Sequence, residues 1–261
     1  MVQSDRMSAC HPFLDHPRPL AIAHRGGSLE AEENTRPAFD HAVALGYSHV
    51  ELDVHATRDG VVVIHHDPTL ARICGDPRAI HDLDAESLRD VRTKGGAEIL
   101  PLAALLESHP QLKLVIELKS DAVVEPLAEL VRAMDCLPRI AVGAFKFSRT
   151  ERLRDYLGPG LCISPSWRGA LAVRLAGLGL PQRRPAADVL QVPVRYHGVP
   201  VVVPSFLRAA RRFGLPVQVW TVNEGAEMVR LLEMGVDAIM TDRPTLLRDI
   251  LRKRGEWHGG P

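Results

Sequence analysis

Short apolar runs alternate along this chain with longer segments whose apolar residues recur at helical spacing. Eight of the runs predict buried parallel strands, because they are nearly continuous in apolar residues. These runs start near residues 20, 49, 112, 139, 161, 189, 217 and 238. Helices are predicted between them, including 123–134, 205–213 and 226–234, and a glycine follows the last two, as is common at helix C-termini.

Eight strand–helix units in 261 residues predict the α/β class and a TIM (β/α)8 barrel. An open, doubly wound sheet is the main alternative fold. That fold often carries the fingerprint G-x-G-x-x-G after its first strand, whereas this first strand is followed by His24-Arg25-Gly26-Gly27. The barrel is therefore the favoured prediction. A glycine pair directly after a strand also predicts a turn in which the backbone approaches another segment closely.

The alternation is interrupted after the second strand. Thr57-Arg58-Asp59-Gly60 is a turn signal, and a β-branched run over 61–64 follows it. We therefore expect a hairpin that brings His66 back toward the second strand. Residues 67–100 are less regular, with one helix expected near 85–91.

Glu51 and Asp53 alternate with valine and leucine in the second strand. Their period-two spacing aims both carboxylates at the same face of the sheet, about 6 to 7 Å apart along the strand. Mutual repulsion and loss of hydration make such a pair costly, and a divalent cation relieves both costs. Oxygen ligands of this kind suit Mg²⁺, Mn²⁺ or Ca²⁺. The alternative is a solvated strand face with two ordinary acids.

Polar side chains collect where the predicted strands end. The first strand ends in His24 and Arg25, the third in Glu117 and Lys119, the seventh in Trp220 and Thr221, and the eighth in Thr241 and Asp242. In a β/α barrel these carboxyl ends converge on one pocket, where active sites form. Solvated loop residues would not recur so regularly at strand ends, so the pattern favours a functional site.

Glu117 lies inside an apolar strand, so its carboxylate needs a partner. One interpretation is an ion pair with Lys119. The other makes Glu117 the third carboxylate of the metal site and leaves Lys119 as a point charge for an anionic substrate. The sequence pattern allows both interpretations.

Two histidines are expected at the same rim. Displacement at phosphorus needs one group that takes a proton from the nucleophile and one that gives a proton to the leaving oxygen, and His24 and His66 fit these roles. Arg25 can hold phosphate oxygens through paired hydrogen bonds. His65 points to the opposite side from His66 by strand alternation, so we assign it a structural role.

The composition adds several exclusions. Basic and acidic residues number 32 each, which gives no overall electrostatic footprint for nucleic acid or an anionic membrane. The four cysteines lack the spacing of a zinc site or a disulfide framework, and Cys136 and Cys162 are expected to be small buried residues. Without an apolar signal segment or 18 consecutive apolar residues, we expect a cytoplasmic protein with no transmembrane segment.

Several motifs occur in an order and spacing that are specific only in combination. They are His24-Arg25-Gly26, Glu33-Asn34-Thr35, Glu51-Leu52-Asp53-Val54, Thr57-Arg58-Asp59-Gly60, His66-Asp67-Pro68-Thr69-Leu70-Ala71-Arg72, Ile116-Glu117-Leu118-Lys119, Val219-Trp220-Thr221-Val222-Asn223 and Gly235-Val236-Asp237-Ala238-Ile239-Met240-Thr241-Asp242-Arg243-Pro244. Together they resemble the signature of the glycerophosphodiester phosphodiesterases, the GDPD family. The resemblance runs over residues 20–251, nearly the whole chain.

The resemblance implies one TIM-barrel domain over 19–254, with a small insertion over 67–111 after the second strand. Residues 1–18 would be a loosely ordered lead-in, and 255–261 a C-terminal tail. The implied activity is metal-dependent hydrolysis of glycerophosphodiesters, which are small molecules, to an alcohol and glycerol 3-phosphate. The attacking group would be water, or the glycerol 2-hydroxyl by way of a cyclic phosphate.

The resemblance also implies residue roles. Glu51, Asp53 and Glu117 would bind one divalent ion, Mg²⁺ or Ca²⁺, with Mn²⁺ as a further candidate. His24 and His66 would be the acid–base pair. By the same resemblance, the phosphate would be contacted by Arg25 and Lys119, and the pocket would be lined by Trp220.

The nearest alternative is a lysophospholipase D or phospholipase-like activity on the same scaffold, which needs apolar loops over the barrel mouth. The candidates are Phe145, Phe147, Trp167 and Leu171, although such residues more often belong to the core. A non-catalytic barrel that binds a phosphorylated ligand would typically lack one of the two histidines. An aldolase-type barrel would need a desolvated lysine with no carboxylate two residues away, unlike Lys119.

The chain departs from the family pattern outside the predicted metal and acid–base positions. Glu32 stands where the family usually has proline, Cys74 lies near a usual threonine, and residues 100–105 lack an acidic residue often found there. We expect these departures to affect the shape of the substrate cleft and the alcohol that it accepts.

Overall fold

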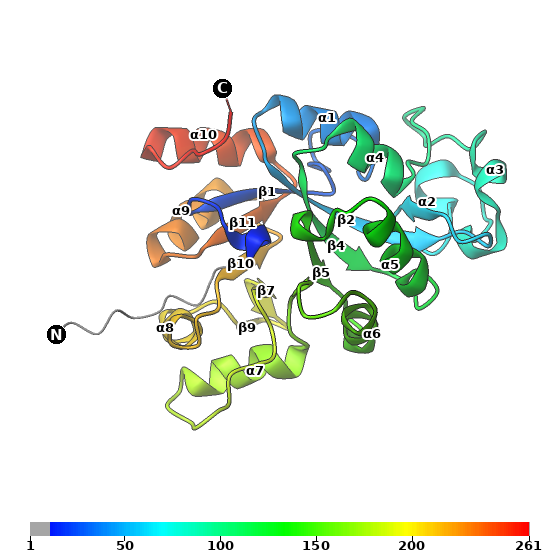
Figure 1. The fold of residues 1–261 in the computed structure, drawn as a ribbon. Helices are drawn as coiled ribbons and strands as arrows, with labels where there is room; N and C mark the ends of the chain where they lie inside the picture. The colour runs from blue at the N-terminus through cyan, green and yellow to red at the C-terminus, as the bar shows by residue number, and fades with distance from the viewer. Residues whose placement is uncertain (1–10, 261) are drawn as a thin grey trace.

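Eight parallel strands form the centre of the computed structural model, which describes residues 11–260 (Figure 1). They are β1 (Leu20–His24), β2 (His49–Ala56), β4 (Lys113–Leu118), β5 (Ile140–Gly143), β6 (Cys162–Ile163), β7 (Leu190–Pro193), β10 (Val217–Trp220) and β11 (Ala238–Thr241). Their order in the sheet is β6-β5-β4-β2-β1-β11-β10-β7. The eight strands predicted from the apolar runs are therefore confirmed.

The sheet curls until its two end strands face each other. The backbone N–H of Asp188, just before β7, donates to the carbonyl oxygen of Ile163 in β6 at 2.9 Å, and the N–H of Gln191 donates to Ser164 Oγ at 3.2 Å. Parallel strands that are joined by helices and curled in this way form a TIM-type (β/α)8 fold, as predicted. An open doubly wound sheet is excluded, because its end strands would lie at opposite edges.

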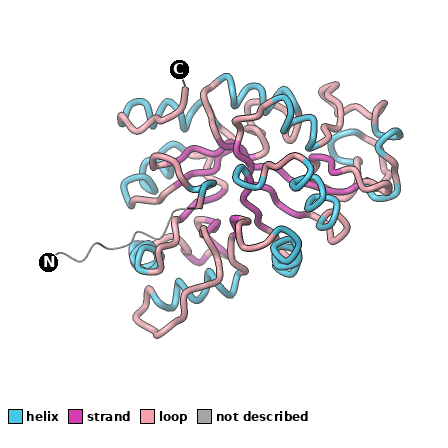
Figure 2. The backbone as a smooth tube through the Cα atoms, in the orientation of Figure 1, coloured by secondary structure: helices cyan, strands magenta, loops and turns pink. Residues whose placement is uncertain are grey.

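Helices surround the strands (Figure 2). The longer ones are α1 (Arg36–Ala44), α4 (Leu102–Ser108), α5 (Val124–Ala133), α6 (Phe147–Leu157), α7 (Trp167–Ala176), α8 (Pro204–Arg212), α9 (Gly225–Met234) and α10 (Pro244–Arg254). Helix α1 begins after Thr35 because the Thr35 hydroxyl oxygen accepts the backbone N–H of Ala38 at 3.4 Å. In α5 the buried residues Val124, Leu127 and Val131 follow helical spacing, which turns one face toward the sheet.

The amino end of the barrel is closed by a residue from the lead-in. Phe13, in the short 3-10 helix η1 (Pro12–Leu14), is fully buried in an apolar cluster with the first residues of several strands. Residues 12–14 are therefore ordered against the barrel, unlike the loosely ordered lead-in that the sequence predicted. An apolar pair, Phe13-Leu14, between polar and proline residues is too short a signal to predict this burial. Residues 1–10 lie outside the described part of the chain.

The hairpin predicted after β2 is confirmed. Strand β3 (Val62–Ile64) pairs antiparallel with β2, with Val54 opposite Ile64. Beyond it, α2 (Ala71–Cys74), η2 (Ile80–Asp82) and α3 (Ala85–Leu88) form a unit at one side of the barrel, with an apolar cluster of its own (Figure 1). Helix α3 is shorter than the helix predicted near 85–91.

The loops after β5, β6 and β7 differ from the prediction. An unpredicted hairpin of β8 (Arg195–Tyr196) and β9 (Val199–Pro200) follows β7. Phe145, Trp167 and Leu171 are exposed and do not belong to the core, while Phe147 is half-buried. Apolar character alone therefore predicted the wrong environment for residues in these loops.

Cys136 and Cys162 are buried, as predicted, and Cys74 is partly exposed. Cys10 lies outside the described residues. Within residues 11–260, every helix is too short or too polar to cross a bilayer.

Candidate active site

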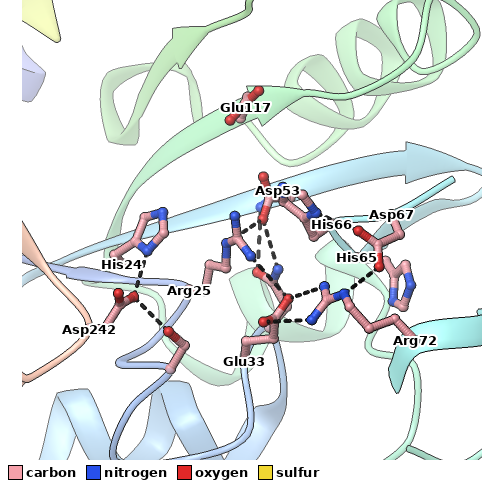
Figure 3. A network of polar contacts seen from close by, with 12 residues as sticks. His24, Arg25, Glu33, Asp53, His65, His66, Asp67, Arg72, Glu117 and Asp242 are labelled. Carbon is pink, nitrogen blue, oxygen red and sulfur yellow. Dashed lines mark hydrogen bonds and ion pairs between the residues drawn. The ribbon is translucent and has the colours of Figure 1, made fainter. Parts of the chain in front are cut away.

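Glu51 and Asp53 of β2 meet Glu117 of β4 on one face of the sheet. Figure 3 shows Asp53 and Glu117 of this cluster. Asp53 lies opposite Glu117 in the parallel register of the two strands, and alternation places Glu51 on the same face as Asp53. The three side chains offer carboxylate oxygens that lie within 4.8 Å of one another. Glu51 and Asp53 are buried, and Glu117 is half-buried. The structure thus brings together the three residues that the sequence singled out.

The electrostatics of this carboxylate cluster are unfavourable without a cation. Burial, followed by repulsion from Asp53 and Glu117, raises the pKa of Glu51 to about 8. Burial also raises the pKa of Glu117. In addition, Oδ1 of Asp53 is buried and has no hydrogen-bond partner among the described residues. Three crowded carboxylates, one with a buried oxygen that accepts no hydrogen bond from residues 11–260, fit a hard divalent cation, whose charge offsets the repulsion.

Two cationic side chains flank the carboxylate cluster. Lys119 Nζ lies 3.4 Å from Asp53 Oδ1 and 3.3 Å from Glu117 Oε1. Arg25 Nε lies 3.1 Å from Asp53 Oδ2, and the backbone N–H of Arg25 donates to Glu51 Oε2 at 3.2 Å. Both cations are therefore placed where they can contact an anion bound beside the carboxylates.

The turn after β1 fixes the positions of His24 and Arg25. Arg25 and Gly26 have positive φ angles of 52° and 82°. A Cβ atom at Gly26 would lie 2.7 Å from the Cβ of Ala38 in α1, so only glycine allows this close packing. This is the close backbone approach that the glycine pair predicted.

His24 is held by a carboxylate at the end of the neighbouring strand β11. Its Nδ1 lies 2.6 Å from Asp242 Oδ1, while its Nε2 lies 3.6 Å from Glu51 Oε2 in the carboxylate cluster. Burial opposes the protonated form, but the charge of Glu51 and the hydrogen bond to Asp242 raise the pKa of His24 above its usual value. Ser28 Oγ and Asn223 Nδ2 donate to Asp242 at 2.6 and 2.7 Å, which fixes the carboxylate.

His66 has a matching arrangement on the other side of the site (Figure 3). Its Nδ1 lies 2.6 Å from Asp67 Oδ1, and Arg72 Nε donates to Asp67 Oδ2 at 2.5 Å. Arg72 also donates to Glu33 at 2.7 Å, and Glu33 accepts from Arg25 at 3.1 Å. Burial opposes the charged form of Asp67, but the hydrogen bonds from Arg72 and His66 lower its pKa to about 2. A continuous set of polar contacts therefore links His66 to Arg25.

The sequence reasoning did not assign roles to the two aspartates behind the histidines. A signal was present in each case. Asp67 directly follows His66, and Asp242 ends the strand that pairs with β1 in the barrel, where Thr241 lies opposite Ala23. An aspartate bound at Nδ1 fixes the tautomer and orientation of an imidazole, so both aspartates are positioning residues.

The remaining predicted residues lie at the edge of the site. His65 is buried and its Nε2 lies 3.1 Å from the carbonyl oxygen of Thr69; burial lowers its pKa. Trp220, at the end of β10, packs edge-to-face against Phe145 with ring centroids 6.1 Å apart. The structure therefore separates His65 from the carboxylate cluster and places Trp220 at the mouth of the barrel.

Glu32, where the family resemblance led us to expect proline, connects the insertion to the loop after β1. Its carboxylate accepts a short hydrogen bond from Thr93 Oγ1 and another from the N–H of Gly95 at 3.1 Å. Glu33, the next residue, belongs to the polar contacts around Arg25. The departure at Glu32 thus gives this chain a specific link between the insertion and the site.

Comparison with known proteins supports the resemblance seen in the sequence. The sequence model of the glycerophosphoryl diester phosphodiesterase family matches residues 24–153 and 162–246. The probable glycerophosphodiester phosphodiesterase 2 of Mycobacterium tuberculosis is 37% identical over 254 residues, covering 95% of this chain and 96% of that protein. Human lysophospholipase D GDPD1 is 26% identical over 267 residues, covering 88% of this chain and 85% of its own.

Solved structures show the same fold. The glycerophosphodiester phosphodiesterase of Agrobacterium tumefaciens matches with a TM-score of 0.75 at 24% identity, covering 89% of this chain and 99% of that chain. An Oleispira antarctica phosphodiesterase in complex with the product sn-glycerol-3-phosphate matches with a TM-score of 0.72 at 21% identity, covering 90% and 97%. The chain therefore belongs to the glycerophosphoryl diester phosphodiesterase family and is a phosphoric diester hydrolase.

Proposed function

We propose that this chain hydrolyses glycerophosphodiesters in a metal-dependent reaction that releases an alcohol and glycerol 3-phosphate. The observation that carries the proposal is the carboxylate cluster between two histidines, each of which is bound by an aspartate at Nδ1. The names of the relatives support the substrate class, as does the sn-glycerol-3-phosphate bound to the Oleispira antarctica protein.

Glu51, Asp53 and Glu117 would hold one divalent ion, Mg²⁺, Ca²⁺ or Mn²⁺. When bound, the ion supplies positive charge that stabilises the phosphoryl oxygens in the transition state. Arg25 and Lys119 bind the phosphate oxygens that do not contact the ion. Both side chains lie within 3.4 Å of carboxylate oxygens in the cluster, so they are next to the proposed metal ligands. Trp220 lines the mouth through which the alcohol part of the substrate projects.

His24 and His66 transfer the protons. Since an aspartate engages Nδ1 of each ring, Nε2 is the nitrogen that exchanges a proton with the substrate. One imidazole accepts the proton of the nucleophile, and the other protonates the leaving alcohol oxygen. With water as the nucleophile this step gives glycerol 3-phosphate directly. With the glycerol 2-hydroxyl it gives a cyclic phosphate, which a water molecule then opens to glycerol 3-phosphate. The distance of 3.6 Å between His24 Nε2 and Glu51 Oε2 supports a role for His24 in this transfer, because it brings the imidazole close to the proposed metal ligands.

The test is release of glycerol 3-phosphate from glycerophosphocholine and glycerophosphoethanolamine by the purified chain. His24→Ala and His66→Ala should each lower kcat by about 10² to 10⁴. His81→Ala is the matched control, because His81 is exposed in η2 of the insertion and should leave kcat unchanged. Full activity of both variants would contradict the acid–base roles. Binding of glycerophosphocholine without turnover would favour the non-catalytic barrel instead.

The exposed side chains of Phe145 and Trp167 at the barrel mouth favour a second candidate substrate. They could contact the acyl chain of a lysophospholipid, and the human relative carries the name lysophospholipase D. To distinguish the two candidate substrates, kcat/KM is measured for lysophosphatidylcholine and for glycerophosphocholine with the same enzyme preparation. A higher value for the lysolipid would assign the chain to this second activity.

A further inference from the structure

Three consecutive segments that follow strands at the mouth of the barrel each expose an aromatic side chain. Phe145 follows β5, Trp167 follows β6 and Tyr196 lies in the β8–β9 hairpin after β7, with exposed fractions of 76%, 67% and 60%. Val199 of the same hairpin is 63% exposed, and Leu171 in α7 is 45% exposed. We call these five residues the aromatic rim. Such large apolar side chains gathered on one surface normally indicate an interaction site.

The aromatic rim is continuous with the candidate active site. All three segments follow the carboxyl ends of their strands, which is the end of the barrel that carries the carboxylate cluster. The ring of Phe145 contacts that of Trp220 edge-to-face, with centroids 6.1 Å apart. A partner that covers the aromatic rim would therefore lie against the mouth of the site.

Each exposed aromatic residue has a cationic neighbour in the sequence. These neighbours are Lys146, Arg168 and Arg195, and all three are exposed. The guanidinium of Arg168 lies 5.5 Å from the ring centroid of Trp167. Lys146 is paired with Asp121 at 2.6 Å, whereas Arg168 and Arg195 form no ion pair with any of residues 11–260. Arg168 is therefore available to an anionic partner. The charge of Arg195 is partly offset by Glu227, whose pKa is lowered by its hydrogen bond from Arg230 and, more weakly, by Arg195.

The charge of the surrounding segment has the same sign. Residues 156–223 contain eight arginines and a single acidic residue, Asp188, although the whole chain is neutral. Asp188 is itself engaged, because its Oδ2 accepts the backbone N–H of Ile163 at 3.0 Å. Of these arginines, Arg168 and Arg195 belong to the segments of the aromatic rim. Arg184 and Arg212 instead contact the carbonyl oxygens of Phe213 and Ala176, at the C-terminal ends of α8 and α7 and so toward the opposite end of the barrel. The excess of arginine therefore makes this half of the barrel locally basic, which the net charge of the chain conceals.

We propose that the aromatic rim docks on an anionic phospholipid bilayer, with the mouth of the barrel facing the membrane. Aromatic rings partition to the boundary between headgroups and acyl chains, and adjacent arginines interact with anionic headgroups. The three aromatic rings lie on separate neighbouring segments, and each has a cationic residue beside it in the sequence. This arrangement suits a membrane surface better than a protein partner, because a protein interface usually has a continuous apolar core. The proposal is based on the exposed residues of the aromatic rim, and it does not depend on which diester the chain hydrolyses.

The test measures co-sedimentation of the full chain with vesicles of phosphatidylglycerol and phosphatidylcholine in equal parts, and with pure phosphatidylcholine vesicles. The chain should bind the anionic vesicles, and added salt should weaken the binding. The triple variant Phe145→Ser, Trp167→Ser, Tyr196→Ser should bind at least about tenfold more weakly. The double variant Arg168→Gln, Arg195→Gln should lose about fivefold for each arginine removed.

Leu178 and Leu180 provide the matched control. They are 61% and 50% exposed, but they follow the C-terminus of α7 and so lie at the opposite end of the barrel from the aromatic rim. The variant Leu178→Ser, Leu180→Ser should bind vesicles like the wild type, while thermal melts verify that every variant is folded.

Three outcomes would overturn the proposal. They are absence of binding by the wild type, equal binding to both kinds of vesicle, and wild-type binding by the folded triple variant. If sedimentation velocity instead shows a dimer that the triple variant dissociates, and vesicles are not bound, the rim is an interface between copies of this chain and the membrane proposal is wrong.

Discussion

Asp242→Asn tests whether the carboxylate behind His24 supports proton transfer. Asp242 accepts hydrogen bonds from His24, Ser28 and Asn223 at 2.6, 2.6 and 2.7 Å. Burial alone would raise its pKa, but the hydrogen bonds from His24 and Ser28 hold the pKa at about 2, against an ordinary value of 3.8. The lowered pKa corresponds to roughly 2 kcal/mol in favour of the ionised form.

Asparagine keeps the shape of this side chain but removes its charge. Because part of this free energy belongs to Ser28 and Asn223, we expect kcat to fall by roughly tenfold, which corresponds to about 1 kcal/mol of transition-state stabilisation. KM should change little, since Asp242 lies behind the imidazole and away from the substrate. Asp242 also helps to raise the pKa of His24, so the limb of the pH–rate profile that reports His24 should move to lower pH.

Asp237→Asn is the matched control for this experiment. Asp237 directly precedes β11 at the opposite end of the strand from Asp242, where it accepts the backbone N–H of Val217 at 2.8 Å. This variant should keep kcat and the pH–rate profile even if its Tm falls. The reasoning would be refuted by a folded Asp242→Asn enzyme whose kcat stays within about twofold of the wild type and whose pH limb does not move.

Three further predictions follow from other parts of the site. Asp67→Asn should lower kcat about tenfold or more without a comparable change in KM, because it removes the anion bound to His66; steady-state kinetics measures this. Gly26→Ala should cost about 3 kcal/mol in urea denaturation, since it combines a positive φ with a 2.7 Å contact, whereas Gly96→Ala, with positive φ but open space, should cost about 1 kcal/mol. Burial raises the pKa of Glu51 to about 8 in the folded chain. The protonated Glu51 carboxyl therefore stabilises the folded state fully at pH values below the pKa of Glu51 in the unfolded chain, and this stabilisation is lost as the pH rises through 8. The Tm of the chelated protein should therefore fall between about pH 5 and pH 8, and saturating Mg²⁺ should flatten this dependence.

The parts of the fold that local sequence determines were predicted correctly. Buried strands are short apolar runs, and parallel strands in a barrel leave their carboxyl ends together, so the meeting of Glu51, Asp53 and Glu117 follows from period-two spacing and strand order. The same logic predicted the hairpin after β2, since an Asp-Gly turn determines where the next strand returns. The domain boundaries and the cytoplasmic location stay predictions.

The remaining features depend on contacts between distant segments. Phe13 closes the amino end of the barrel only because the strands curl around it, and nothing in its neighbours indicates burial. Asp242 and His24 are 218 residues apart in the sequence. They meet only because the last strand, β11, pairs with the first strand, β1, so local sequence spacing does not predict the role of Asp242. Phe145 and Trp167 are apolar in sequence, yet Phe145, in the loop after β5, and Trp167, at the start of α7, are exposed. The net charge of the whole chain is zero, so it gives no indication that arginines outnumber acidic residues within 156–223.

The most direct test of metal-dependent phosphodiester hydrolysis is release of glycerol 3-phosphate from glycerophosphocholine after chelation, and again after Mg²⁺, Mn²⁺ or Ca²⁺ is restored. We predict that the chelated wild type is inactive, that at least one of these ions restores turnover, and that folded Glu51→Ala stays inactive with all three. Undiminished release in the presence of chelator, or metal-stimulated turnover by Glu51→Ala at the wild-type rate, would contradict the assignment of Glu51, Asp53 and Glu117 as the metal site.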